Sequence, residues 1–224
     1  MKPILLFDID GTLLNVKRSF MKELIAEILN ELSISPDLIK KRSFAGRTDR
    51  DIFSELVSFS SRPNEMYEEA KRIYLQLMNE NFSPADAEVI DGAREAVYSA
   101  LEAGLEVGLC TGNYRESAYF KVEAAGFSDV FEFGGFGCHH EDRIHLPEVA
   151  HKSFVDIRGY EPEPHQYLII GDTPNDIRCA KYFGAKAISV TTGSFNRDQL
   201  EKHDPDLLLE NLGEVTDWSR YPLN

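Results

Sequence analysis

The chain has 224 residues, 42% of them hydrophobic, and carries a formal net charge of -14 at pH 7. This length suffices for one sizeable domain plus an insertion around a full hydrophobic core. The acidic balance argues against nucleic acid as a partner, because no basic run offsets repulsion by a polyphosphate backbone. Small phosphorylated ligands stay possible where a bound cation or a well-placed basic side chain supplies local positive charge.

Cysteine spacing and the N-terminal sequence bear on the cellular setting. Cys110, Cys138 and Cys179 lie far apart and form no Cys-x-x-Cys pair, which favours neither a disulfide framework nor a zinc ribbon. A reduced, cytoplasmic setting fits best. No signal peptide is recognised, and no segment approaches the roughly 18 apolar residues of a membrane span. We therefore expect a soluble cytoplasmic protein with no membrane partner, either a monomer or a small homo-oligomer.

The first predicted element is a strand over residues 3–8 that ends in two carboxylates. Asp8 and Asp10 lie one residue apart, where the apolar run meets a turn at Gly11. Successive strand side chains point to opposite faces, but the pleat ends where the loop begins, so both carboxylates can face one pocket. One can act as a nucleophile that forms a phospho-intermediate, and the other can donate and later accept a proton. The alternative is an Asp-Gly turn with capping aspartates.

Residues 16–85 show helical periodicity and no convincing strand. Apolar stripes at helical spacing cover 20–32, 52–57 and 66–78. We interpret this region as an all-helical bundle that is inserted after the first strand and lies over the strand ends as a cap. The predicted domains are a core of residues 1–15 and 86–224 and a cap of residues 16–85. The alternative is that these helices are ordinary layers of a single domain.

The segment Gly46-Arg47-Thr48-Asp49 precedes the second stripe and carries a basic residue. Its loop can reach the leaving group of a substrate through Arg47, or it can simply cap the helix. The sequence leaves both readings open.

The rest of the chain alternates apolar strands with helices. Strands are predicted over 105–111, 166–172, 187–192 and 206–209, with a short strand near 130–133 before a flexible glycine turn at 134–137. Helices are predicted over 93–101, 146–158 and 176–183, each followed by a glycine that ends it. This alternation predicts an α/β fold with a doubly wound parallel sheet, in which ligands bind at the carboxyl ends of the strands.

Polar residues follow two further strands at their ends. Thr111-Gly112-Asn113 offers a hydroxyl and a loop whose backbone N–H groups can approach a phosphoryl oxygen, although such a sequence is also a good turn. Asp172 ends the strand before it and Asp176 follows about one helical turn later, so both can approach one cation. Mg²⁺ prefers oxygen ligands and is usually held by one or two carboxylates, water and substrate phosphate.

These motifs, in this order, resemble those of the haloacid dehalogenase superfamily, in its phosphoglycolate-phosphatase-like branch. The resemblance covers nearly the whole chain and is general for the helical insert. It implies a Rossmann-like core with a mobile helical cap and a magnesium-dependent phosphohydrolase that acts on a small phosphorylated metabolite.

The resemblance also implies a role for each matching residue. Asp8 is the nucleophile and Asp10 the general acid and base. Thr111, with the backbone of Gly112 and Asn113, binds the phosphoryl group. The metal ligands implied are the Asp8 carboxylate, the Asp10 carbonyl and Asp172, with Asp176 binding directly or through another ligand.

The family's third motif, a Lys often followed by Pro, has no plain match in this chain. The candidates are Arg143 and Lys152. The basic residue must reach the strand ends, which favours Arg143 before the helix predicted over 146–158, whereas Lys152 falls near its middle. A guanidinium keeps its proton and can grip two oxygens, which suits charge stabilisation at Asp8 and at the phosphoryl group. The alternative for either residue is a solvated basic side chain.

Three rival functions remain at this point. A phosphosugar mutase would share every core motif. A dehalogenase is disfavoured because carbon–halogen displacement needs neither Asp10 nor the pair Asp172 and Asp176. A non-catalytic phosphoryl-binding module has no need for a second acid at the position of Asp10.

Overall fold

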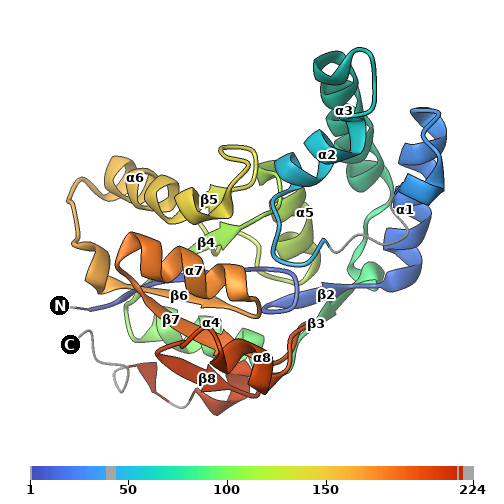
Figure 1. Cartoon of the computed structure of the whole chain (residues 1–224). Helices are drawn as coiled ribbons and strands as arrows, with labels where there is room; N and C mark the ends of the chain where they lie inside the picture. Colours follow the sequence, from blue (N-terminus) through green and yellow to red (C-terminus); the bar gives the residue numbers. More distant parts are fainter. Residues whose placement is uncertain (1, 39–43, 216, 219–224) are drawn as a thin grey trace.

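The computed structural model describes residues 2–38, 44–215 and 217–218 (Figure 1). Residues 39–43 of the predicted 16–85 region, and residues 1, 216 and 219–224 of the predicted core, lie outside the described residues. Within the described ranges, no helix is both long and apolar enough to cross a lipid bilayer.

A six-stranded parallel sheet forms the centre of the molecule, in the order β5-β4-β1-β6-β7-β8. Its strands are β1 (Ile4–Phe7), β4 (Glu106–Thr111), β5 (Gly134–Phe136), β6 (Tyr167–Gly171), β7 (Lys186–Val190) and β8 (Leu207–Leu209). Every residue of β1 is buried, as expected of a central strand that is covered on both faces.

Helices cover both faces of the sheet, so the predicted doubly wound α/β fold is confirmed. Leu5 and Phe7 of β1 pack on the face of α4 (Ala93–Glu102) and α5 (Arg115–Ala124). Ile4 and Leu6 alternate to the other face, toward α6 (Leu146–Arg158) and α7 (Pro174–Phe183). The short helix α8 (Arg197–Glu201) joins this second face through a buried leucine. The predicted glycine stops are present, with left-handed backbone after α6 and α7.

The short strand β5 lies at Gly134–Phe136, so the prediction of a strand at 130–133 and a flexible turn at 134–137 is wrong. The glycines are needed for close packing, because a Cβ on Gly135 would lie 2.0 Å from the carbonyl oxygen of Leu146 in α6. The aromatic residues that suggested the earlier strand are instead buried in the core. The apolar residues at 130–133 therefore indicate burial in the core and not pairing in the sheet.

Three helices follow the first strand: α1 (Arg18–Glu31), α2 (Asp49–Val57) and α3 (Pro63–Asn81). A small antiparallel pair, β2 (Leu14–Val16) and β3 (Ala87–Val89), connects them to the sheet. The sequence had not predicted this pair, because each strand is only three residues long. Short 3-10 turns complete the fold at Pro36–Leu38, Pro84–Asp86, Arg143–His145, Pro164–Gln166 and Leu212–Glu214.

The three helices share a hydrophobic cluster, which Tyr114 joins and against which Phe120 and Cys138 also pack. Tyr114, at the start of α5, is fully buried in this cluster. Its ring stacks on Phe53 of α2 with centroids 5.8 Å apart, and its hydroxyl donates to the Tyr67 hydroxyl of α3 at 3.0 Å. The helices therefore pack on the core at the beginning of α5, beside the loop that ends β4.

Candidate active site

Three neighbouring strands, β4, β1 and β6, carry the predicted polar residues to one edge of the sheet. Asp8 follows β1, Thr111 ends β4 and Asp172 follows β6. The Asp8 backbone N–H donates to the carbonyl of Ile170 at 2.9 Å, which fixes where its side chain leaves the sheet. A cavity of about 930 Å³ opens here, and both Asp8 and Asp10 line it. Both carboxylates therefore face one pocket.

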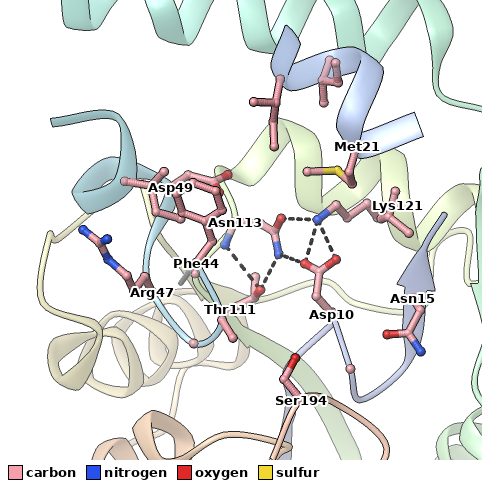
Figure 2. Close-up of a pocket in the computed structure, with 18 of the residues that line it drawn as sticks. Asp10, Asn15, Met21, Phe44, Arg47, Asp49, Thr111, Asn113, Lys121 and Ser194 are labelled. Carbon is pink, nitrogen blue, oxygen red and sulfur yellow. Dashed lines mark hydrogen bonds and ion pairs between the residues drawn. The ribbon is translucent and has the colours of Figure 1, made fainter. Parts of the chain in front are cut away.

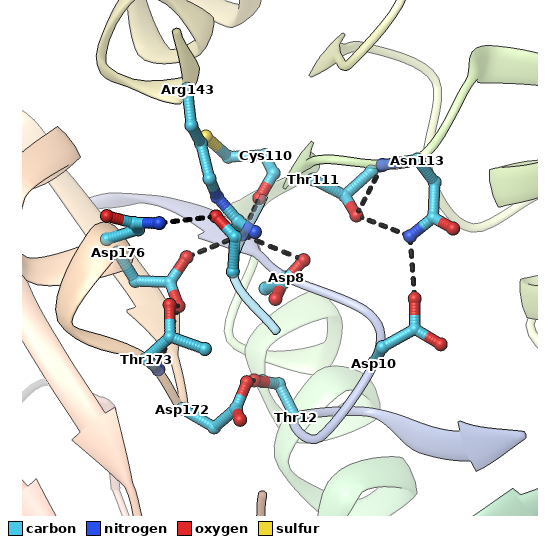
Figure 3. A network of polar contacts seen from close by, with 12 residues as sticks. Asp8, Asp10, Thr12, Cys110, Thr111, Asn113, Arg143, Asp172, Thr173 and Asp176 are labelled. Atoms are coloured by element: carbon cyan, nitrogen blue, oxygen red, sulfur yellow. Dashed lines mark hydrogen bonds and ion pairs between the residues drawn. The ribbon is translucent and has the colours of Figure 1, made fainter. Parts of the chain in front are cut away.

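Asp8, Asp172 and Asp176 form a buried cluster of carboxylates in which one oxygen of each lies within 4.8 Å of the others (Figure 3). Burial raises the pKa of Asp8 to about 6, with Arg143 acting in the opposite direction and the neighbouring carboxylates adding to the rise. Burial, followed by the charges of Asp176 and Asp8, raises the pKa of Asp172 well above its usual range. Such a cluster of hard oxygen ligands is suited to a divalent cation.

Arg143 is the only basic residue that an ion pair joins to this cluster within the described ranges. Its Nη2 lies 2.9 Å from Asp8 Oδ1 and 2.5 Å from Asp176 Oδ1. The residue opens a 3-10 turn just before α6, where Asp142 caps the turn by accepting from the Ile144 N–H. Lys152 lies in the middle of α6 and is exposed. The sequence placed Arg143 before the start of this helix and Lys152 near its middle, and the structure has both residues at those positions.

The side chain of Asp10 points away from the three-carboxylate cluster and into a second network (Figure 2). The amide nitrogen of Asn113 donates to Asp10 Oδ2 at 2.7 Å and to Thr111 Oγ1 at 2.8 Å. Lys121 Nζ donates to Asp10 Oδ1 at 2.8 Å, to Asp10 Oδ2 at 2.7 Å and to Asn113 Oδ1 at 2.6 Å. Together, Lys121 and Asn113 hold both oxygens of the Asp10 carboxylate.

Sequence reasoning missed Lys121. The residue lies on α5, and its side chain is only 5% exposed. It shares the buried face of the helix with Ser117, Ala118 and Val122. A lysine on the apolar face of a helix is unusual, because a buried ammonium needs a charged partner. The position of Lys121 on an apolar helix face was the one sign in the sequence that this lysine has a buried partner. It does not reveal which carboxylate that partner is.

The start of α2 is docked on the loop that follows β4. The Asp49 backbone N–H donates to the Gly112 carbonyl at 2.7 Å, and the Tyr114 N–H donates to Asp49 Oδ2 at 2.8 Å. Gly112 permits this approach, because a Cβ there would lie 2.1 Å from the carbonyl oxygen of Arg47. Burial raises the pKa of Asp49 to about 6, while the positive charge of Lys121 acts in the opposite direction.

Arg47 lines the cavity but is bound by acidic residues of α2, the helix that follows it. Its Nε lies 2.6 Å from Asp51 Oδ2, and its Nη1 lies 2.6 Å from Glu55 Oε2. The helix cap is provided by Thr48, whose side chain accepts from the Asp51 N–H. The capping function that the sequence suggested for this segment therefore belongs to Thr48.

Comparisons with known proteins agree on one family. A family model described as Haloacid dehalogenase-like hydrolase matches residues 5–190. A phosphoglycolate phosphatase from Mesorhizobium japonicum is 24% identical, with 96% of this chain and 93% of the relative covered. A validoxylamine A 7'-phosphate phosphatase from Streptomyces hygroscopicus subsp. limoneus is 27% identical, with 96% of each protein covered.

Solved structures show the same fold. A putative haloacid dehalogenase-like hydrolase from Bacteroides fragilis superposes with a TM-score of 0.73 at 20% identity, over 96% of this chain and 100% of the other. A β-phosphoglucomutase from Clostridium difficile superposes with a TM-score of 0.72 at 16% identity, over 99% of both chains.

Proposed function

Because this chain belongs to the haloacid dehalogenase-like hydrolase family and is a phosphatase of that family, we propose that it hydrolyses a small phosphorylated metabolite through an aspartyl phosphate on Asp8. The observation that carries this proposal is the environment of Asp8. Its carboxylate lies at the cavity, 2.9 Å from Arg143 and within a cluster of three carboxylates. The proposed nucleophile, its counter-charge and the proposed metal ligands thus meet at one edge of the sheet.

In the proposed reaction, a carboxylate oxygen of Asp8 attacks phosphorus in line, and the bond from phosphorus to the leaving oxygen breaks. Asp10 gives its proton to that oxygen. It then takes a proton from water, whose oxygen attacks the phosphorus on Asp8; the bond from phosphorus to the Asp8 oxygen breaks, which restores the carboxylate and releases inorganic phosphate. Arg143 stabilises negative charge on Asp8 and on the phosphoryl oxygens, because its guanidinium stays protonated throughout.

We propose that the phosphoryl group is bound by the loop after β4. Thr111, Gly112 and Asn113 line the same cavity as Asp8. Lys121 is assigned to the same machinery as a positioning residue. With Asn113 it holds the Asp10 carboxylate on the leaving-group side of the cavity.

Magnesium is the proposed cofactor. The residues fit a divalent cation, because three buried carboxylates face one guanidinium and leave negative charge uncompensated. Asp8, Asp172 and the Asp10 carbonyl would hold the ion, with Asp176 also in reach. The ion would supply charge stabilisation to the phosphoryl oxygens in the transition state.

We further propose that residues 16–85 act as a cap on a core of residues 1–15 and 86–224. The hydrogen bonds between Asp49 and the loop at Gly112 and Tyr114 support a docked position in which bulk water is kept from the cavity. The cytoplasmic setting, a monomeric or small homo-oligomeric state and the lack of a nucleic-acid partner remain predictions from composition and sequence.

A phosphosugar mutase is the second candidate, because a β-phosphoglucomutase has the same fold. A mutase returns the phosphoryl group to a second hydroxyl of the sugar, whereas a phosphatase transfers it to water. Conversion between hexose phosphate isomers without release of phosphate would identify the mutase.

The proposed function is tested by phosphate release from a panel of phosphorylated metabolites. The wild-type protein should release phosphate from at least one ester, with the rate dependent on Mg²⁺. An Asp8→Asn variant should remain at background. If no ester in a panel that a control phosphatase hydrolyses is turned over above the Asp8→Asn rate, the proposal is wrong.

A further inference from the structure

The cavity does not end at the carboxylates but continues between α1 and α2. On α1 it is lined by Met21, Leu24, Ile25 and Ile28, and on α2 by Ile52 and Leu56. These positions recur at helical spacing, so each helix turns one apolar face toward the cavity. Figure 2 shows the side chain of Met21 close to Lys121 and above Asp10. An apolar groove is therefore continuous with the candidate active site.

The groove exists because α1 and α2 share a packing partner and leave space between them. Each of the two helices packs against α3, and α1 and α2 lie on either side of it in Figure 1. The resulting cavity of about 930 Å³ lies near the upper end of the range, roughly 300 to 1,000 Å³, that holds drug-sized ligands. A phosphoryl group on a two-carbon leaving group would occupy only a small part of it.

Two groove residues have no role in the core among the described residues. Ile25 and Ile52 are partly exposed, and neither belongs to any of the three hydrophobic clusters. Both side chains belong to residues that line the cavity. A large apolar side chain that a fold leaves uncovered inside a cavity is available to a ligand.

The groove is present while α2 is docked on the core. The Asp49 N–H bonds to Gly112 at 2.7 Å, and the side-chain amide of Asn175 donates to the Gly46 carbonyl at 2.7 Å. The space between α1 and α2 therefore does not result from α2 standing away from the sheet.

The charged groups along the groove suit the phosphoryl end more than the far end. Arg47 is bound by Asp51 and Glu55. Lys17 and Arg18 lie at the beginning of α1, nearest the connection to the sheet. Farther along α1 and α2, the lining is apolar apart from Glu55, which pairs with Arg47.

We propose that the leaving group of the substrate carries an apolar portion, an alkyl chain or a hydrocarbon ring, that lies between α1 and α2 while its phosphoryl group meets Asp8. This inference rests on the proposed function for the position of the phosphoryl group. Apolar burial then predicts a gain of about fourfold in affinity for each methylene that enters the groove.

The test uses n-alkylphosphonates with two, four and six carbons, which bind without being hydrolysed. Calorimetry on the full chain with Mg²⁺ should show the dissociation constant falling by about fourfold per methylene. Ile25→Ser and Ile52→Ser should weaken this dependence of affinity on chain length. Leu75→Ser is the matched control, because Leu75 is a partly buried aliphatic residue of α3 outside the cavity lining. Leu75→Ser should show the same dependence of affinity on chain length as the wild type.

Affinity that does not rise with chain length in the wild type would overturn the inference. A rise that persists in both isoleucine variants would overturn it as well, because the chains would then bind elsewhere. Hydrolysis of the matching alkyl phosphates, with Asp8→Asn as control, tests the proposed function separately. The two can therefore fail independently.

Discussion

The ammonium group of Lys121 lies 2.8 Å from one carboxylate oxygen of Asp10 and 2.7 Å from the other. The two residues come from α5 and from the loop after β1, and their contact is closed by Asn113, which bonds to both. A carboxylate held at both oxygens has few orientations left. This arrangement suits a group that must meet one substrate oxygen and later one water.

Replacing Lys121 by Met should lower kcat/KM about 10- to 100-fold, because a small misplacement of a proton donor has effects of this order. The loss should be larger for an alkyl phosphate than for p-nitrophenyl phosphate, whose leaving group needs no proton. Lys121→Arg should retain more activity than Lys121→Met, and ethylammonium should partly restore a Lys121→Ala variant. Equal losses on both esters, with no rescue, would reduce Lys121 to a structural role.

Arg143→Ala should lower kcat/KM by about 100- to 1,000-fold, the usual effect of removing one group that stabilises transition-state charge. The physical reason is the loss of the counter-charge beside Asp8 and Asp176. Lys152→Ala should remain at the wild-type rate, because Lys152 is exposed in α6. Circular dichroism should verify that both variants fold. Full activity of Arg143→Ala together with loss of activity in Lys152→Ala would show that the preference for Arg143 over Lys152 is wrong.

Metal binding should be visible in stability, independently of turnover. At about 100 times its dissociation constant, Mg²⁺ should raise the free energy of unfolding of the wild type by about 2.7 kcal/mol. Asp172→Asn should be more stable than the wild type without metal at pH 7, because burial and the acidic neighbours raise the pKa of the Asp172 carboxyl, so that folding must either bury its charge or bind a proton. The same variant should gain little from Mg²⁺.

Asp156→Asn is the matched control for this measurement, since Asp156 is exposed on α6. It should keep the full response to Mg²⁺. An Asp172→Asn variant that Mg²⁺ stabilises as strongly as the wild type would contradict the assignment of the metal site.

Asp49 predicts a pH dependence of stability. Burial raises the pKa of its carboxyl from 3.8 to about 6, so the folded protein binds this proton more tightly than the unfolded chain does. The contribution of Asp49 therefore becomes less favourable as pH rises from about 4 to about 6. Urea unfolding without metal should show wild type losing stability relative to Asp49→Asn across this window. A difference that is constant with pH would contradict the environment assigned to Asp49.

Much of the fold could be predicted because its strands are short apolar runs that end in polar turns. The same pattern located Asp8, Thr111 and Asp172, since the ends of adjacent parallel strands meet at one edge of the sheet. Arg143 could be placed at this edge because the helix after it could be bounded from its apolar period and its final glycine. In each case, the sequence within a few residues of the side chain is enough to place it at the edge of the sheet.

The parts that could not be predicted depend on contacts between distant segments. Lys121 meets Asp10 only because α5 packs beside the loop after β1. The strand at Gly134–Phe136 depends on the close approach of α6, which leaves no room for a Cβ on Gly135. The groove depends on how α1 and α2 pack on α3. The apolar pattern within one segment does not reveal how closely that segment packs against another.

The most direct test of the proposed mechanism is the chemical identity of the phosphorylated residue. Wild-type protein and an Asp10→Asn variant would be mixed with Mg²⁺ and a hydrolysed ester whose leaving group needs no proton, quenched in acid, digested and mapped by mass spectrometry. The mechanism predicts one phosphoryl group on Asp8, accumulating in Asp10→Asn because the attack of water is slowed. Phosphate release with no phosphoryl group on Asp8, or with the group on another residue, would contradict it.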